Sequence, residues 1–105
     1  MNKRAKKKAE KRRRALVHQI LDVVLDINGV EPRQKEYTGN MPTAFFEFSG
    51  HTAGVDIDIR RSGWDYGQPI EVYEHGCLSR PGSAEGVLAK AKFEAAALRE
   101  KGVIS

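Results

Sequence analysis

Apolar and polar residues alternate through the middle of the chain in three short runs, which are separated by glycine-containing turns. The runs are Thr43–Ser49, Gly54–Arg61 and Pro69–His75. Alternation with a period of two is typical of β-strands that bury one face, and short glycine-containing connections are typical of hairpins. The pattern therefore predicts a three-stranded antiparallel meander.

The same alternation assigns each strand residue to one face of the predicted sheet. The apolar face consists of Phe46, Phe48, Val55, Ile57, Ile59, Ile70 and Val72. The opposite face is acidic, with Arg60 offsetting part of the charge, and its carboxylates are Glu47, Asp56, Asp58 and Glu71. A polar outer face suits a solvated antiparallel sheet, and an acidic one also suits a basic protein partner. Both interpretations remain open.

Two segments with helical periodicity flank the strands. Residues 15–28 carry an apolar stripe that ends at Asn28-Gly29, a common helix stop. Leu21 and Leu25 widen this stripe, which indicates either deep burial or a second partner on that flank. The second helix is expected at Ala84–Lys101, with Ser83 as its N-cap and Gly102 after its end.

These elements predict an α+β fold of order α-β-β-β-α, with both helices on one face of the meander. The 105 residues are enough for one domain, which we place at residues 15–105, preceded by a basic arm at residues 1–14. The single cysteine excludes an internal disulfide and fits a reducing cytoplasm. No apolar run reaches the length of a membrane span, and no secretory signal follows the basic start, so we expect no membrane partner.

Charge is distributed very unevenly along the chain. Residues 1–14 hold nine cations and one carboxylate, a formal charge of +8, whereas the remainder has nine cations and thirteen carboxylates, a charge of −4. The nine cations are Lys3, Arg4, Lys6, Lys7, Lys8, Lys11, Arg12, Arg13 and Arg14. Such an arm is expected to fray when unbound and to become helical when a polyanion neutralises it. It predicts nucleic-acid binding without sequence preference, and the alternative is a solubilising tail.

Few other side chains are candidates for metal binding, catalysis or partner contacts. His51, His75 and Cys77 are the metal-ligand candidates, but a structural zinc site normally needs four ligands, and surface histidines beside a buried thiol are the simpler interpretation. No catalytic constellation or phosphate-binding glycine loop is present, so we expect neither an enzyme nor a cofactor. Trp64 and Tyr66, in the second hairpin, are candidates either for a partner contact or for capping the core.

The element order resembles that of double-stranded-RNA-binding domains. That family begins its second helix with a lysine cluster that contacts phosphates. Here the corresponding segment is Ser83-Ala84-Glu85-Gly86. This departure argues against duplex-RNA binding through the fold itself.

Residues 43–75 also resemble a broad group of small, uncharacterised phage and prophage proteins. The resemblance lies in Phe46-x-Phe48-Ser49-Gly50-His51, Val55-x-Ile57-x-Ile59, Gly63-Trp64 and Val72-Tyr73. It implies a non-enzymatic accessory protein, acting in the cytoplasm of the host cell, that binds and inhibits a bacterial nucleoprotein machine. Anti-CRISPR proteins that inhibit Cas nucleases are examples of that role. The alternative from the residues is a nucleic-acid-binding accessory protein that acts through the arm.

Overall fold

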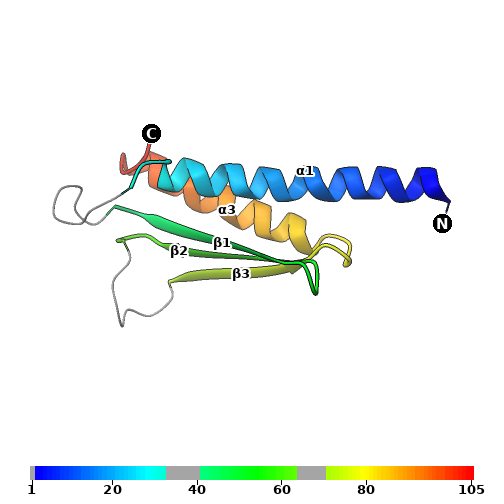
Figure 1. The fold of residues 1–105 in the computed structure, drawn as a ribbon. Coiled ribbons are helices and arrows are strands. Elements are labelled where there is room, and N and C mark those ends of the chain that lie inside the picture. The colour runs from blue at the N-terminus through cyan, green and yellow to red at the C-terminus, as the bar shows by residue number, and fades with distance from the viewer. Residues whose placement is uncertain (1, 33–40, 64–70) are drawn as a thin grey trace.

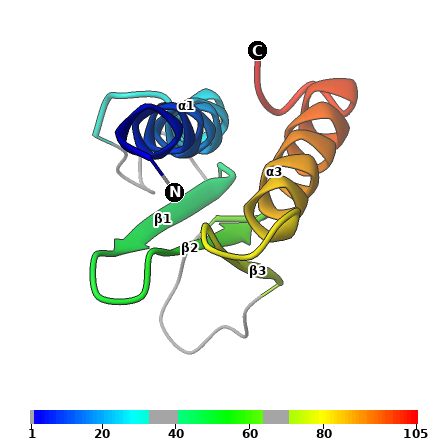
Figure 2. The same ribbon diagram turned by 90° about the vertical axis from the view of Figure 1, so that its right-hand side faces the viewer.

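The computed structural model of the protein describes residues 2–32, 41–63 and 71–105. The elements follow the order α1 (Lys3–Asn28), β1 (Thr43–Ser49), β2 (Gly54–Arg60), β3 (Val72–Cys77) and α3 (Ser83–Glu100). The three strands form one antiparallel sheet in the order β1-β2-β3, and both helices cover the same face of it (Figures 1 and 2). The predicted α+β fold is confirmed.

The strand register agrees with the predicted faces. Phe46 pairs with Ile57 across β1 and β2, and Ile57 pairs with Glu74 across β2 and β3. The third strand lies further along the chain than expected, at Val72–Cys77, and Pro69 and Ile70 lie outside the described residues. It continues through Gly76, where α3 approaches the sheet backbone and leaves no room for a side chain. A Cβ at Gly76 would lie 2.7 Å from Val87 Cγ2 and 2.8 Å from the Ser83 carbonyl oxygen.

The core fills the layer between the helices and the sheet. Its most buried large side chains, all with less than 2 % of their surface exposed, are Ile20, Ile27, Val55, Ile57, Ile59 and Val87. Small residues of α3, Ala91 and Ala95, are buried beside them and let α3 pack closely. This arrangement confirms the helix faces expected from the periodicity.

One expectation about burial is wrong, and one of the two alternatives for the wide stripe of α1 is disfavoured. Phe48 was expected in the core, but 46 % of it is exposed. It belongs to β1, an edge strand, and therefore has a strand neighbour on one side only. Leu25 is 39 % exposed, so the wide stripe of α1 is not deeply buried throughout.

Helix boundaries follow local capping chemistry, with one correction. Gly29 has a positive φ of 69° and donates its N–H to the Leu25 carbonyl oxygen, so α1 stops where the sequence predicts. The N-cap of α3 is Gly82, not Ser83. The Ser83 hydroxyl instead accepts the Cys77 N–H at 2.9 Å and ties the start of α3 to the end of β3.

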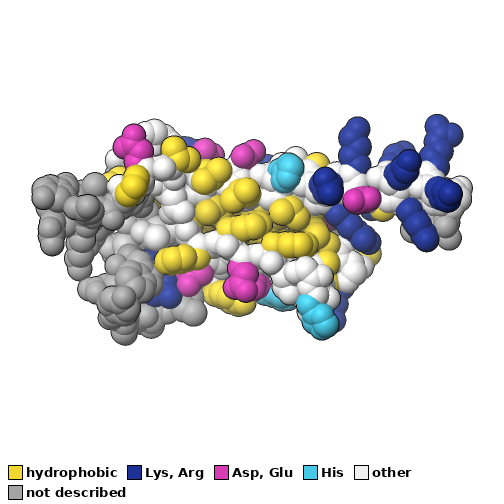
Figure 3. Space-filling model, viewed as in Figure 1, with side chains coloured by type: hydrophobic (Ala, Val, Ile, Leu, Met, Phe, Trp, Pro, Cys, Tyr) yellow, Lys and Arg dark blue, Asp and Glu magenta, His cyan; other side chains and the backbone are white. Residues whose placement is uncertain are grey.

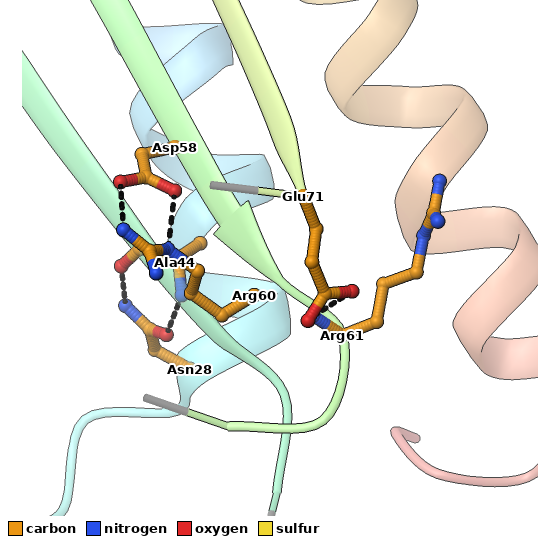
Figure 4. Close-up of polar contacts among 6 residues, drawn as sticks. All are labelled: Asn28, Ala44, Asp58, Arg60, Arg61 and Glu71. Atoms are coloured by element: carbon orange, nitrogen blue, oxygen red, sulfur yellow. Dashed lines mark hydrogen bonds and ion pairs between the residues drawn. The ribbon is translucent and has the colours of Figure 1, made fainter. Parts of the chain in front are cut away.

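Polar side chains anchor both helices to the sheet. The Asn28 amide accepts the Ala44 N–H and donates to the Ala44 carbonyl oxygen, both at 2.7 Å, so it occupies part of the open edge of β1 (Figure 4). On α3, the buried Glu94 carboxylate receives two bonds from the Arg61 guanidinium, at 2.9 and 3.1 Å. This ion pair was not anticipated, because the apolar periodicity of α3 does not mark Glu94.

Candidate nucleic-acid interface

The basic arm is the N-terminal half of α1, and it projects beyond the rest of the fold. Residues 3–14 continue the helix, and most of this segment lies past the ends of the sheet and α3 (Figure 1); the molecule measures 54 × 27 × 21 Å. The sequence led us to expect an arm that is frayed when unbound and helical when a polyanion neutralises it. The structure has the helix, continuous with the packed part of α1.

Local interactions explain why the highly charged residues 3–14 form a helix. The Asn2 side chain caps the start by accepting the Ala5 N–H at 2.8 Å. Glu10 and Arg14, one turn apart, lie 3.5 Å from each other. The arm also extends a helix whose C-terminal half is already packed, so it adds residues without the cost of nucleation. Alanine, lysine and arginine are themselves strong helix formers.

The cations surround most of the arm. At about 100° per residue, Lys and Arg side chains point in every direction except the side that carries Ala5 and Ala9. The nine cationic residues are all exposed, and Figure 3 shows several of them spread along the projecting helix. Such a rod presents charge to phosphates on two sides at once.

The acidic outer face of the sheet is less charged than its sequence suggests. Arg60 forms two bonds with the Asp58 carboxylate, at 2.8 and 3.1 Å (Figure 4), which raise the pKa of Arg60. His75 Nδ1 pairs with Asp56. Glu71 accepts the Arg61 backbone N–H at 3.3 Å. Glu47 is exposed, and among the described residues no ion pair joins it to a cation.

Two exposed aromatic residues share this face. Phe45 and Tyr73 lie opposite Asp58 on its two neighbouring strands and are 44 % and 53 % exposed. Partial desolvation and the neighbouring Asp56 raise the pKa of Tyr73. Aromatic side chains on a polar sheet face were visible in the alternation, but they were not selected as site residues. Trp64 and Tyr66 lie outside the described residues.

The candidate metal ligands do not form a site. Within residues 2–32, 41–63 and 71–105, no group of three His, Cys, Asp or Glu side chains is placed to hold a metal ion. His75 pairs with Asp56, and His51 is exposed. Cys77 Sγ contacts Ser79 Oγ at 3.0 Å and the Thr52 carbonyl oxygen at 3.5 Å.

Residues of the turn that follows β3 contact the Cys77 thiol. The hydrogen bond from Ser79, assisted by the charge of Arg80, lowers the pKa of Cys77. Within the described part of the chain, no hydrogen bond joins Cys77 to His75, so the pair lacks the contact by which a histidine base activates a thiol nucleophile.

An apolar area is exposed where α1 runs along β1. Figure 3 shows the apolar side chains gathered between the two elements, with charged residues around them. Among the described apolar residues of these two elements, Leu25 of α1 and Phe48 of β1 are 39 % and 46 % exposed, and Val17, Leu21 and Phe46 are partly buried. The flank of α1 therefore remains open to a partner.

Comparison with known proteins identifies no relative. No protein-family model matches the chain, and no curated protein or solved structure is similar to it. Among the described residues, no helix combines the length and the hydropathy needed to cross a membrane. The most distinctive surface feature of the described residues is the projecting basic helix.

Proposed function

We propose that this protein is a non-enzymatic accessory protein that binds the phosphate backbone of nucleic acid through residues 3–14 of α1. The observation that supports the proposal is the projection of nine exposed cations on a helix that extends beyond the fold. The C-terminal half of α1 is packed in the core and holds the basic arm in one direction. A tail that only improved solubility would not need a fixed direction.

The dimensions of the arm suit a nucleic-acid groove. Twelve helical residues span about 18 Å, and a helix with its side chains is about 10–12 Å wide, close to the width of the B-DNA major groove. Cations on several sides of the helix can then meet phosphates of both strands. Contacts of this kind are independent of sequence and release condensed counterions, so the affinity should fall steeply with salt.

The test is fluorescence anisotropy with labelled duplex DNA, duplex RNA and single strands over a series of salt concentrations. One phosphate contact is worth a factor of about eight at 0.1 M salt, so replacing Lys6, Lys7 and Lys8 by Gln should weaken binding by a factor of about 500 if all three contact phosphates. The salt slope should fall by about 0.9 for each lost contact with B-DNA.

The matched control is Lys92→Gln combined with Lys101→Gln, which removes exposed cations from α3 instead. This control should retain most of the affinity. Wild-type protein that shows no salt-dependent binding to any of these probes would refute the proposal. So would a control variant that loses as much affinity per charge as the arm variant.

The second candidate function is inhibition of a bacterial nucleoprotein machine, such as a Cas nuclease, by docking of the outer sheet face onto a basic protein surface. It is supported by the exposed Phe45 and Tyr73 beside Glu47. Asp56 and Asp58 are poor probes of this surface because they already form pairs with His75 and Arg60.

A cleaner test of this docking uses Glu47→Lys and Phe45→Ala, which leave those pairs intact. Purified Cas nuclease complexes should be captured by the wild-type protein and lost with either variant. Unchanged capture by both variants would exclude the outer face as the contact surface.

A further inference from the structure

A groove lies where the basic arm meets the turn between β3 and α3. It encloses about 510 Å³, and it is lined by two elements that are far apart in sequence. From α1 come Arg12, Arg13, Leu16 and Gln19, and from the turn and the start of α3 come Leu78, Ser79, Arg80, Pro81 and Glu85. We call this feature the arginine groove, after Arg12, Arg13 and Arg80.

Arg80 is held in place by the backbone of its turn. Its N–H donates to the Cys77 carbonyl oxygen at 3.1 Å, and its own carbonyl oxygen accepts the Ser83 N–H at 3.2 Å. Leu78 N–H donates to the Ala53 carbonyl oxygen at 3.0 Å, which fixes the turn to the β1–β2 hairpin. The backbone at Arg80 is therefore fixed, across the groove from α1.

The chemistry of the lining favours an anion. The lining residues include three arginines and one acidic residue, Glu85, and in the described part of the chain no ion pair engages Arg12, Arg13 or Arg80. Guanidinium groups bind phosphate with directed, often bidentate hydrogen bonds. The apolar lining from Leu16, Leu78 and Pro81 suits the sugar that accompanies each phosphate.

We propose that the arginine groove seats a backbone phosphate of the bound nucleic acid, with Arg80 as a contact outside the arm. This inference rests on the proposed function, and it adds a fixed point on the folded domain from which the nucleic acid continues along the arm. Arg80 would also place a phosphate-binding cation near the start of α3. The first turn of that helix, Ser83-Ala84-Glu85-Gly86, has no cation of its own. A ligand anchored at both places is oriented relative to the sheet, which an arm alone would not achieve.

The first test compares two single-charge deletions in the full chain. Arg80→Ala should weaken binding to a labelled duplex about eightfold at 0.1 M salt and reduce the B-DNA salt slope by about 0.9, the effect of one lost phosphate contact. Lys92→Ala, an exposed residue of α3 outside the groove, is the matched control and should change affinity less than twofold. Circular dichroism checks that both variants keep the wild-type fold.

The second test removes the opposing carboxylate and predicts a gain. Glu85→Gln should tighten binding about two- to threefold, because repulsion between the carboxylate and a seated phosphate disappears. Glu100→Gln removes the same charge at the far end of α3 and should leave affinity nearly unchanged. Duplex DNA, duplex RNA, inorganic polyphosphate and vesicles of anionic lipid are compared as probes.

The outcomes separate this inference from the proposed function. If the arm variant loses binding while Arg80→Ala and Glu85→Gln match their controls, the groove is refuted and the arm proposal stands. If the wild-type protein binds none of the nucleic acids, both fail. Equal effects of Arg80→Ala on binding to vesicles and to duplexes would refute a nucleic-acid-specific seat and indicate a general anion site.

Discussion

The ion pair between Arg61 and Glu94 provides the sharpest test of what holds α3 on the sheet. Only 3 % of the Glu94 side chain is exposed, and its oxygens lie 2.9 and 3.1 Å from Arg61 and 3.6 Å from Lys90 Nζ. Replacing Arg61 by Ala leaves the carboxylate buried with one weaker partner. Removal of one member of a fully buried pair costs about 3–5 kcal/mol. Because 45 % of the Arg61 side chain is exposed, water can replace part of the lost contact. We therefore expect a loss of about 1.5–3 kcal/mol at pH 7.

The loss should depend on pH in a defined direction. In the wild-type protein, the hydrogen bonds from Arg61 lower the pKa of Glu94. The stabilisation from this carboxylate is therefore complete above its unfolded pKa of about 4.3 and disappears as pH falls through the lower folded pKa. Without Arg61, burial should raise the folded pKa instead, so that acid relieves the penalty. The difference between variant and wild type should thus be larger at pH 7 than at pH 4.

Urea denaturation followed by far-ultraviolet circular dichroism, at both pH values, measures this difference. Arg99→Ala is the control, because Arg99 also pairs with a carboxylate, Asp26, at 3.1 Å, but on the surface. It should cost at most about 1 kcal/mol. Adding Glu94→Leu to Arg61→Ala should recover much of the stability, since no unpaired charge remains buried at position 94. If Arg61→Ala costs no more than Arg99→Ala, or if its cost does not shrink at pH 4, the Arg61–Glu94 pair does not hold α3 on the sheet in this way.

Three further predictions test the packing. Asn28→Ala removes two hydrogen bonds to the edge of β1 and should cost about 1–3 kcal/mol in urea denaturation, with faster amide exchange at the start of that strand; unchanged exchange would contradict it. Gly76→Ala forces a Cβ against α3 and should lower the free energy of unfolding by about 1–3 kcal/mol. Gly86→Ala should instead raise it by about 0.5–1 kcal/mol, because nothing lies within 4 Å of the new Cβ and alanine favours the helix. Leu25→Lys should lower the free energy of unfolding by less than about 1 kcal/mol, because Leu25 is 39 % exposed. Ile20→Ala should lower it by about 2–5 kcal/mol, because Ile20 is fully buried. Equal losses for the two variants in thermal unfolding would contradict the exposure of Leu25 and show that the flank of α1 is covered.

The elements themselves follow from local patterns in the sequence. A period of two at Val55, Ile57 and Ile59 specifies a strand with one buried face, and the glycine at 29 can adopt the positive φ that ends α1. The basic arm is equally local, because nine cations among fourteen residues are a property of composition. These features could be predicted because each depends on neighbours within a few residues.

Contacts between distant segments were decided only by the tertiary structure. The sequence does not indicate that Arg61 lies beside Glu94, 33 residues later, or that Arg80 lies across a groove from Arg12 and Arg13. The exposure of Phe48 likewise depends on β1 being an edge strand, which its alternation cannot reveal. Periodicity encodes which side of an element is apolar. Which side chains meet, and which apolar surface remains uncovered, depends on how the elements pack together.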